Sequence, residues 1–524
     1  MKHFLLIFLL IPAFTHAQRA YKAPEVPLGW HLPSPQPDHI VLNFTENPAT
    51  EMSVTWRTDT TVSTAYAEIA PATAAPKFWR NAQTLEAKTE LMDASAVKSA
   101  YTKAHYHSVT FTGLEPATLY AYRVGDGTHW SEWIQFTTAQ AEEAPFSFLY
   151  VGDAQNYILE LWSRLIREGY RKAPDASFII HAGDLVTDAH SERQWQEWFT
   201  AGGWIHRMLP SIPTPGNHEY EGYTEEEEDN DISHLSVQWQ PQFTLPQNGP
   251  AGAEWDAYDE TVYYVDYQGT RIISLNSSRL QEEQVAWVEN VLENNPNTWT
   301  VVTAHHPMFS ASEGRNNKKL RSLWKPVFDK YRVDLVLQGH DHSYARGRTF
   351  PGKNQMAGLN MRDVSGTMYV VSVSGGKMYT LDPRRWENFD ARQDRGAENT
   401  QLFQLVNVNY DTLVYESYTA TGELYDRFRL VKGKNGAPNS FTDLQQEAIS
   451  ERRHGNTIPY EDELPEAMRT NIMNKYNGYE FDGIRYVNDP DFQGYYVELE
   501  KGEKEINLKL SMQGAILSEV VEEE

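Results

Sequence analysis

The sequence predicts a multidomain protein in which an all-β sandwich is followed by an α/β domain and then by a small α+β module. Three observations support this order. Short runs that alternate apolar and polar residues fill positions 36–139, buried strand-like runs alternate with amphipathic helical patterns over 144–432, and a polar break at 432–440 leads into a last mixed segment. A chain of 524 residues is also too long for one hydrophobic core.

The first 17 residues, MKHFLLIFLLIPAFTHA, have the pattern of a secretory signal peptide. Lys2 and His3 precede a short apolar run, and Ala17 is a small residue suited to cleavage. The run is too short to span a bilayer, and no later segment reaches the required length. We therefore expect a secreted or periplasmic protein.

The composition limits the partners and ligands of the chain. The formal net charge is −26, from 46 Lys and Arg against 72 Asp and Glu, which argues against nucleic acid or an anionic membrane as a partner. An anionic substrate would need strong local positive charge, which metal ions supply. The chain has no cysteine, so disulfides and thiolate ligands are excluded.

Residues 22–139 contain six strand patterns separated by turn-rich stretches. They are HIVLNF, EMSVTWRT, TAYAEIA, YHSVTFTGL, TLYAYRVGD and WSEWIQFTTA. The motif LEPATLY at 114–120 resembles the corner of fibronectin type III domains, which implies a sandwich of about seven strands. No chemistry is evident here, so the expected role is packing or positioning.

Residues 144–432 are expected to form an α/β layered core. The buried strands are FSFLYVGD, ASFIIHAGD, TWTVVTAHHP, VDLVLQGHDH and TMYVVSVSGG, and the helices are ILELWSRLIREGYRKAP, ERQWQEWFTAGGWIHRML, EEQVAWVENVLENNP and LRSLWKPVFDKYR. The two-strand pattern of LFQLVNVNY and TLVYESYTA predicts that the last strands of the sheet are antiparallel.

Polar side chains follow five of the predicted strands at the point where each one ends. They are Asp153, Asp184, Asn217 with His218, His305, and His340 with His342. The carboxyl ends of strands in α/β sheets are where ligands bind, so these groups are expected to converge. One Gly-Asp or one histidine alone is more often a turn or a structural residue, but the ordered set indicates a site.

This ordered set, GD, GD, GNH, HxP and GHxH, resembles the calcineurin-like metallophosphoesterases, and within them the purple acid phosphatases. The resemblance covers the sandwich and the α/β segment, and it implies an α/β/β/α sandwich with two metal ions such as Fe, Zn or Mn. It implies that one metal is held by Asp153, Asp184 and His342, and the second by Asp184, Asn217, His305 and His340. Asp184 would bridge the two ions, whose mutual repulsion a shared carboxylate offsets.

Two positions depart from the family. The purple enzymes have GDxxY, and their tyrosinate gives the colour, whereas Thr187 stands at that place here. Many relatives have GDxH at the first strand, where this chain has Gln155. Gln155 either ligates a metal weakly through its amide oxygen or holds a metal-bound water.

Further residues are assigned to the substrate. In the family the histidine at position 218 faces the substrate, so we assign His218 to the leaving group or the phosphoryl group; the alternative is a supporting histidine held by Glu219. Arg315 is either a phosphate clamp or a surface arginine, and His306 is a candidate substrate-binding residue. Tyr344 and Arg346, within GHDHSYAR, are expected to be structural.

A long insertion follows the GNHE motif. Its charge run EEEEDN at 225–230 is expected to be a solvated loop, whereas the aromatic part after it could fold over the metal site as a lid. Trp239 and Phe243 are the residues that such a lid would bring to the substrate.

The last segment, 441–524, combines a helix (LPEAMRTNIMNKY) with the strands GYEFDGIRYVN, GYYVELEKG and KEINLKLSMQG. It weakly resembles the PepSY modules of exported bacterial proteins. Its role is open, and an unknown protein partner is one possibility.

The sequence therefore predicts an exported, acid phosphatase-like hydrolase that cleaves small phosphate monoesters by attack of a metal-activated hydroxide. A phosphodiesterase or nucleotide pyrophosphatase on the same metal core is the alternative among enzymes. A degenerate, non-catalytic surface binding protein is the alternative of another class, because Gln155 and Thr187 depart from the family pattern.

Overall fold

The structure of the chain is a computed structural model. It describes residues 29–523 except 96, 98–102, 229, 231, 313–314, 351–360, 382–385, 387–388, 435, 445–463, 489–492 and 502–503. The predicted signal peptide, residues 1–17, lies outside the described residues.

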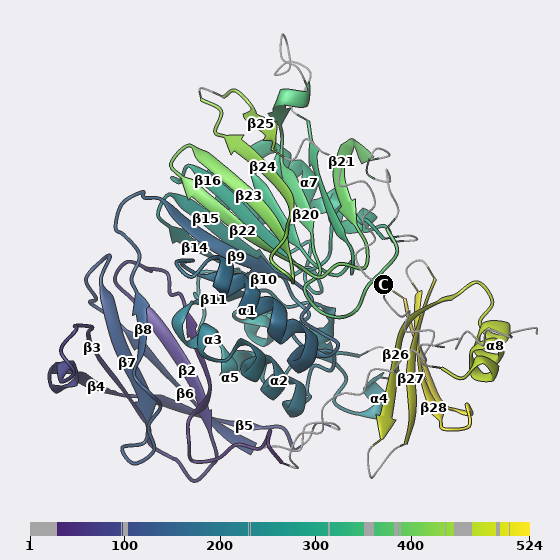
Figure 1. The fold of residues 1–524 in the computed structure, drawn as a ribbon, viewed down its shortest axis with the longest axis horizontal. Coiled ribbons are helices and arrows are strands. Elements are labelled where there is room, and N and C mark those ends of the chain that lie inside the picture. Colours follow the sequence, from purple (N-terminus) through teal and green to yellow (C-terminus); the bar gives the residue numbers. More distant parts are fainter. Residues whose placement is uncertain are drawn as a thin grey trace, which may run out of the picture.

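The N-terminal domain is a β-sandwich, as predicted (Figure 1). One sheet has the order β1-β2-β6-β5 and the other the order β4-β3-β7-β8. The strands are β1 (Asp38–Asn43), β2 (Met52–Thr58), β3 (Tyr66–Pro71), β4 (Gln83–Glu86), β5 (Lys88–Asp93), β6 (Lys103–Phe111), β7 (Leu119–Gly125) and β8 (Ile134–Thr137). The sequence missed β4 and β5 because most of their residues are exposed and show no clear alternation.

The motif at 114–120 forms a corner between strands. The backbone N–H of Glu115 donates to the hydroxyl of Tyr120 at 2.9 Å, the contact that defines a tyrosine corner. The apolar side chains of both sheets, such as Trp56 and Tyr122, meet in the core of the sandwich. Their burial holds the two sheets together.

The α/β domain has two stacked sheets with helices outside them. One sheet continues as β19-β25-β24-β23-β22-β9-β10-β11, and the other has the order β14-β15-β16-β17-β20-β18-β21. Val301 packs into the core between the sheets and Val302 into the core under the outer helices, because successive residues of a strand face opposite sides. The layered α/β/β/α prediction is confirmed.

The strands of this domain follow the predicted order along the chain. They are β9 (Phe146–Val151), β10 (Ile179–His181), β11 (Ser211–Pro213), β12 (Tyr220–Glu221), β13 (His234–Leu235), β14 (Tyr263–Tyr267), β15 (Thr270–Leu275), β16 (Trp299–Ala304), β17 (Leu335–Gln338), β18 (Tyr344–Thr349), β19 (Val364–Ser365), β20 (Met368–Val371), β21 (Ala391–Ala397), β22 (Leu402–Asn409), β23 (Thr412–Thr419), β24 (Leu424–Val431) and β25 (Asn439–Asp443). β22 and β23 pair antiparallel, as predicted. β25 still belongs to the large sheet, so this sheet extends past residue 441, where the last module was expected to begin.

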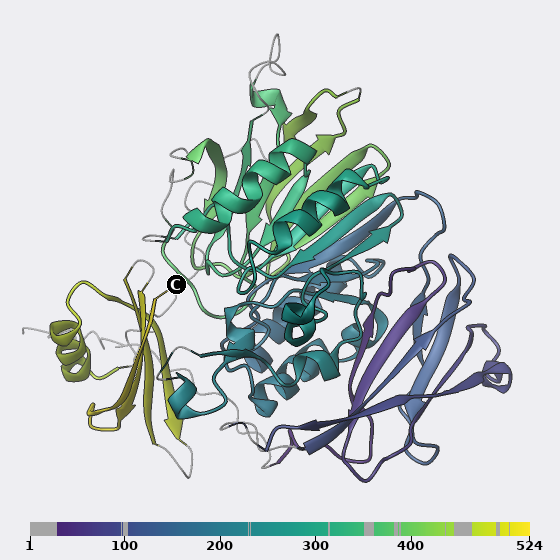
Figure 2. The ribbon, with the colours of Figure 1, turned by 180° about the vertical axis from the view of Figure 1, so that it is seen from behind.

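Helices cover the outer faces of both sheets. Those along the chain are α1 (Ser163–Lys172), α2 (Glu192–Gly202), α3 (Trp204–Met208), α4 (Glu225–Glu228), α5 (Trp239–Gln242), α6 (Gln284–Glu293) and α7 (Lys318–Tyr331), with the short turns η1 (Phe78–Asn81), η2 (Ile158–Trp162), η3 (Asn217–Glu219), η4 (Ala253–Tyr258) and η5 (Met361–Asp363). Figure 1 shows α1, α2 and α3 in front of the large sheet. Figure 2, seen from behind, shows α6 and α7 on the outer face of the other sheet. The single helix predicted over 192–209 is divided into α2 and α3 at Gly203, which has φ +52°.

The sandwich and the α/β domain share one continuous sheet of 12 strands. β1 of the sandwich pairs parallel with β11 of the α/β domain, with Asn43 opposite Ser211. The side-chain amide of Asn43 also donates to the carbonyl of Ser211 at 2.9 Å. The N-terminal domain is therefore built onto the strand that leads to Asn217.

The prediction that the aromatic residues of the insertion form a lid over the substrate is wrong. Trp239 and Phe243 are 0% and 1% exposed and pack against each other, and Phe243 also packs against Trp195 and Trp198 of α2. The insertion uses its large aromatic side chains to build core, so neither ring is available to a substrate. In the charge run, α4 forms a single helical turn.

The last module has α8 (Glu466–Lys475) and a four-stranded antiparallel sheet, β26 (Glu480–Asn488), β27 (Gln493–Lys501), β28 (Lys504–Ser511) and β29 (Ile516–Glu523). Apolar residues of α8, β27 and β28 form a separate small core that includes Ile472, Val497 and Leu508. The α+β prediction is confirmed, although β29 was not expected. Within the part of the chain that the structure describes, no helix has the length and apolar character needed to cross a bilayer.

Candidate metal centre

The predicted strand ends meet at one edge of the α/β domain. β9, β10 and β11 run parallel in one sheet, and β16 and β17 run parallel in the other. Asp153, Asp184, Asn217, His305, His340 and His342 all follow these strands and converge between the two sheets. Residues far apart in sequence are thus brought together by parallel strand order.

The backbone turns sharply where these residues lie. Asp153, Asp184 and His340 have φ of +52°, +51° and +70°, a region that residues other than glycine rarely adopt. At Gly339 a Cβ atom would lie 2.4 Å from Oδ2 of Asp153, so only glycine fits there. This close approach lets the backbone N–H of His340 donate to Oδ1 of Asp153 at 2.7 Å.

One group of donor atoms surrounds Asp184 and Asn217. His305 Nε2 lies 3.1 Å from Asp184 Oδ2 and 3.0 Å from Asn217 Oδ1. His340 Nδ1 lies 3.1 Å from Asn217 Oδ1 and 3.2 Å from His305 Nε2. These are the four residues that the family resemblance assigned to the second metal.

A second group of side chains also contacts Asp184 Oδ2. The amide nitrogen of Gln155 lies 2.9 Å from Asp184 Oδ2 and 3.0 Å from His342 Nε2. His342 Nε2 lies 3.8 Å from Asp153 Oδ1. Asp184 is therefore next to both groups, as a bridging ligand must be.

The donor set fits metal ions. The carboxylate oxygen Asp153 Oδ2 and the amide oxygen Gln155 Oε1 are buried and accept no hydrogen bond from the described residues. His305 Nδ1 bonds to the carbonyl of Ala182 at 2.9 Å and His342 Nδ1 to that of Lys377 at 3.1 Å, which directs each Nε2 lone pair into the cluster. Buried oxygens that lack a donor, beside imidazole nitrogens with free lone-pair direction, are satisfied when a cation binds.

The pKa shifts of Asp153 and His305 agree with a metal site here. Burial raises the pKa of Asp153 well above its usual range, and the Asp184 carboxylate adds to the rise. Burial lowers the pKa of His305, but Asp184 and Asp153 outweigh burial and raise it to about 9. A proton on His305 thus offsets the two carboxylates, and metal ions compete with protons for such ligands.

Glu219 fixes the loop that carries Asp184. Its buried carboxylate accepts from the backbone N–H groups of Asp184 at 2.9 Å, Leu185 at 2.8 Å and Gly216 at 2.7 Å. The imidazole of the preceding residue, His218, bonds through Nδ1 to the carbonyl of Thr187 at 2.7 Å, and its backbone N–H donates to Asp184 Oδ1 at 3.1 Å. From the sequence, Glu219 was considered only as a residue that would hold His218. In the structure its carboxylate instead fixes the backbone around Asp184.

Arg315 and His306 lie beside the cluster. Arg315 is 6% exposed, so the surface-arginine reading is wrong; its Nη1 donates to the carbonyl of His340 at 3.4 Å and lies 3.6 Å from Asp341 Oδ1. His306 Nδ1 bonds to Ser277 Oγ at 2.9 Å, and its ring centroid is 4.3 Å from that of His340.

Sequence reasoning missed two neighbours of the cluster, Ser277 and Lys377. Each follows a strand that ends at the same edge of the sheet, β15 and β20, and this position was the available signal. Their residue types carry no metal-ligand pattern, which is why the motifs did not single them out.

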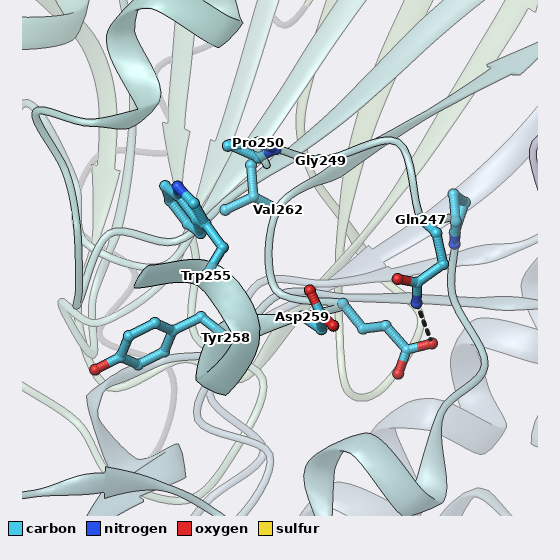
Figure 3. Close-up of a pocket in the computed structure, with 9 residues that line it drawn as sticks. Gln247, Gly249, Pro250, Trp255, Tyr258, Asp259 and Val262 are labelled. Atoms are coloured by element: carbon cyan, nitrogen blue, oxygen red, sulfur yellow. Dashed lines mark hydrogen bonds between the residues drawn. The ribbon is translucent and has the colours of Figure 1, made fainter. Parts of the chain in front are cut away.

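A separate small pocket lies in the insertion (Figure 3). Its lining includes Gln247, Trp255, Tyr258 and Glu260, and Gln247 donates to the Glu260 carboxylate at 3.0 Å. None of its lining residues belongs to the strand-end cluster. The cluster, and not this pocket, gathers the groups with metal-binding chemistry.

Comparisons with known proteins agree with the geometry. Residues 37–138 match the family described as "Purple acid Phosphatase, N-terminal domain", and residues 146–344 match "Calcineurin-like phosphoesterase". "Acid phosphatase type 7" of Danio rerio is 26% identical over 383 residues, which cover 64% of this chain and 80% of that protein. "Fe(3+)-Zn(2+) purple acid phosphatase 12" of Arabidopsis thaliana is 26% identical over 298 residues, covering 53% and 60%.

A solved structure shows the same fold. The purple acid phosphatase PPD1 from yellow lupin (Lupinus luteus) seeds superposes with a TM-score of 0.61 at 19% identity, covering 75% of this chain and 74% of that one.

The α/β fold and its strand-end donors thus define a calcineurin-like phosphoesterase domain. More particularly, the chain combines this domain with a purple acid phosphatase N-terminal domain, in the order predicted from the sequence. Both family matches end before the last module, so its resemblance to PepSY modules stays a prediction.

Proposed function

We propose that the chain is a binuclear-metal hydrolase of phosphate monoesters. The observation that carries this proposal is the convergence of carboxylate, amide and imidazole donors on Asp184, whose Oδ2 contacts both Gln155 and His305. The relatives named acid phosphatase and Fe(3+)-Zn(2+) purple acid phosphatase support the same reaction class.

The two donor groups would hold one metal ion each. Asp153, Asp184 and His342 would hold the first, and Asp184, Asn217, His305 and His340 would hold the second. Gln155 would be a further ligand of the first through Oε1 after its amide turns, because its Nε2 now faces Asp184 and His342. When bound, such ions supply a nucleophile at neutral pH and stabilise charge on phosphoryl oxygens. Imidazole, carboxylate and amide donors suit Zn, Fe and Mn.

His218 is the residue we assign to the leaving group. Its Nδ1 is held by the Thr187 carbonyl, so Nε2 is the nitrogen that can exchange a proton with the substrate. In the reaction a water molecule releases one proton to solvent and its oxygen bonds to phosphorus, the ester P–O bond breaks, and the departing oxygen takes a proton from His218, which solvent then replaces. His306 and Arg315, both next to His340, are proposed to bind phosphoryl oxygens.

A parallel assay tests the proposed reaction. The purified, metal-loaded protein should hydrolyse p-nitrophenyl phosphate much faster than bis-p-nitrophenyl phosphate. Hydrolysis of the diester alone would replace the monoesterase by a phosphodiesterase. Well under one metal ion per chain, together with no hydrolysis after Mn, Zn or Fe is supplied, would favour the non-catalytic binding protein instead.

We also propose that the protein is exported, because residues 1–17 have the pattern of a signal peptide. Mass spectrometry of the protein recovered outside the cytoplasm should find an N-terminus at Gln18. Recovery of the uncleaved chain from the cytoplasm alone would contradict export.

A further inference from the structure

A buried polar joint connects the sandwich to the α/β domain. Arg57 of β2 is 0% exposed, and its guanidinium bonds to Asp38 at 2.8 and 2.6 Å and to Gln196 of α2 at 2.8 Å. The same guanidinium also contacts the carboxylate of Glu192, which is 3% exposed and is the first residue of α2. A bidentate arginine pair of this kind fixes orientation as well as distance.

The start of α2 in turn fixes the loop after β10. Oε1 of Gln194 accepts from the backbone N–H groups of Thr187 at 2.6 Å and Asp188 at 3.0 Å. Glu192 also accepts from the side chain of Gln238 at 2.6 Å, so α2 is tied to the insertion as well. Moving the first turn of α2 would therefore move the loop that contains Thr187.

Thr187 is the residue whose carbonyl holds the imidazole of His218, at 2.7 Å from Nδ1. Contacts thus join Arg57 to Glu192, and Gln194 to Thr187 and Thr187 to His218, while the first turn of α2 connects Glu192 to Gln194. The contact between Glu192 and Arg57 joins residues 135 positions apart, and it crosses from one domain to the other.

We propose that Arg57 and Glu192 are positioning residues for His218, so that the sandwich domain completes the active site. The inference rests on the proposed function, because it assigns the sandwich a part in proton transfer to the leaving group. Proton transfer needs its donor within hydrogen-bond reach of the ester oxygen, and small displacements of such a group reduce the rate strongly.

The test exploits leaving groups of different basicity. Glu192→Ala should lower kcat for phenyl phosphate about tenfold and change kcat for p-nitrophenyl phosphate little, because only the poorer leaving group depends strongly on the proton donor. KM and the number of bound metal ions should stay as in the wild type. Glu192→Gln, which keeps the shape of the side chain, should recover most of the loss.

Two controls separate positioning from general damage. Asp266→Ala breaks an arginine–carboxylate pair elsewhere in the α/β domain, because Asp266 faces Arg271 across β14 and β15 just as Asp38 faces Arg57 across β1 and β2. It should leave the ratio of the two kcat values unchanged. In a His218→Asn background, Glu192→Ala should cause no further loss of kcat for phenyl phosphate, because Glu192 acts through His218.

Amide hydrogen exchange gives a readout that does not depend on activity. Exchange at Thr187 and Asp188 of the metal-loaded protein should become faster in Glu192→Ala and stay unchanged in Asp266→Ala. Unchanged exchange in Glu192→Ala, or equal losses on both esters, would overturn the positioning role. A wild-type protein that hydrolyses neither ester would overturn the proposed function, and the exchange data alone would then decide whether the joint orders the loop.

Discussion

Two buried charge clusters lie only a few residues apart on the segment GHDHSYAR, and they are built in opposite ways. In the first, His340 and His342 join carboxylate and amide groups whose acceptor atoms face one another. In the second, Arg346 bonds to Asp426 at 2.8 Å through two nitrogens, and Tyr344 donates to the same carboxylate at 2.7 Å. Both Arg346 and Asp426 are 0% exposed.

The difference shows which property marks a functional site. Burial and ionisable side chains are common to both clusters, so neither property distinguishes them. The cluster of Arg346 contains its own opposite charge, which is what a structural ion pair requires. The cluster of Asp184 leaves the buried oxygens Asp153 Oδ2 and Gln155 Oε1 without a donor among the described residues, and bound cations would complete it.

The largest effect is expected when the incomplete cluster loses its central carboxylate. Asp184→Asn should reduce kcat/KM for p-nitrophenyl phosphate by more than about 1000-fold, because both metal sites lose the ligand they share. The fold should survive, since the substitution also removes the repulsion between Asp184 and Asp153. Circular dichroism and steady-state kinetics on the same preparation check both parts.

Breaking the cluster of Arg346 should lower stability and leave activity largely intact. Asp426→Ala leaves the Arg346 guanidinium buried without its main partner and should lower the free energy of unfolding by about 3–5 kcal/mol. Metal content and kcat per folded molecule should remain close to wild type at low temperature. A loss of metal without a loss of stability would mean that the two clusters are not distinct.

Metal removal should also distinguish the two clusters through the free energy of unfolding. If the ions bind about 1000-fold more tightly than their free concentration, chelation should lower the free energy of unfolding by about 4 kcal/mol per ion. Calorimetry should show a lower Tm for the wild-type protein after chelation and little change for Asp184→Asn. An equal shift in both proteins would place the stabilising ions elsewhere.

A smaller effect is expected from Glu260, a partly buried acid that lines the pocket of Figure 3 and belongs to neither cluster. Burial raises its pKa to about 8, so the folded protein holds this proton between about pH 4.5 and 8, where the unfolded chain has lost it. The contribution of Glu260 to stability is therefore present below pH 4.5 and falls as the pH rises toward 8, by about 2–4 kcal/mol.

Denaturant unfolding at pH 5 and pH 8 measures this contribution. Glu260→Gln should remove most of the difference between the two pH values. If the difference persisted in full in that variant, another group would be responsible.

Much of the candidate site could be predicted because its signals are local. An apolar run that ends in Gly-Asp or in Gly-His-Asp-His specifies both a strand and the groups at its end, so Asp153, Asp184, His340 and His342 were placed correctly at the strand ends. The layered fold followed from the same alternation of strands and helices. Tyr344, expected to be structural, is buried with Arg346 against Asp426.

The features that were missed depend on distant residues. The pairing of β1 with β11 and the contact of Arg57 with Glu192 join segments whose sequences give no sign of each other. Trp239 was expected on the substrate because it lies in a long insertion, but it packs against Phe243 in the core, where burial of a large indole is strongly favourable. Local patterns fix elements and their ends, whereas tertiary partners need the folded chain.

The central claim, that two cations share Asp184, is tested most directly by anomalous diffraction from crystals of the metal-loaded protein. The account predicts two peaks about 3.5–4 Å apart, one next to Asp153 and His342 and the other next to His305 and His340, with Asp184 between them. Crystals of Asp184→Asn should lose both. No peak at the strand ends, or peaks that persist unchanged in Asp184→Asn, would contradict it.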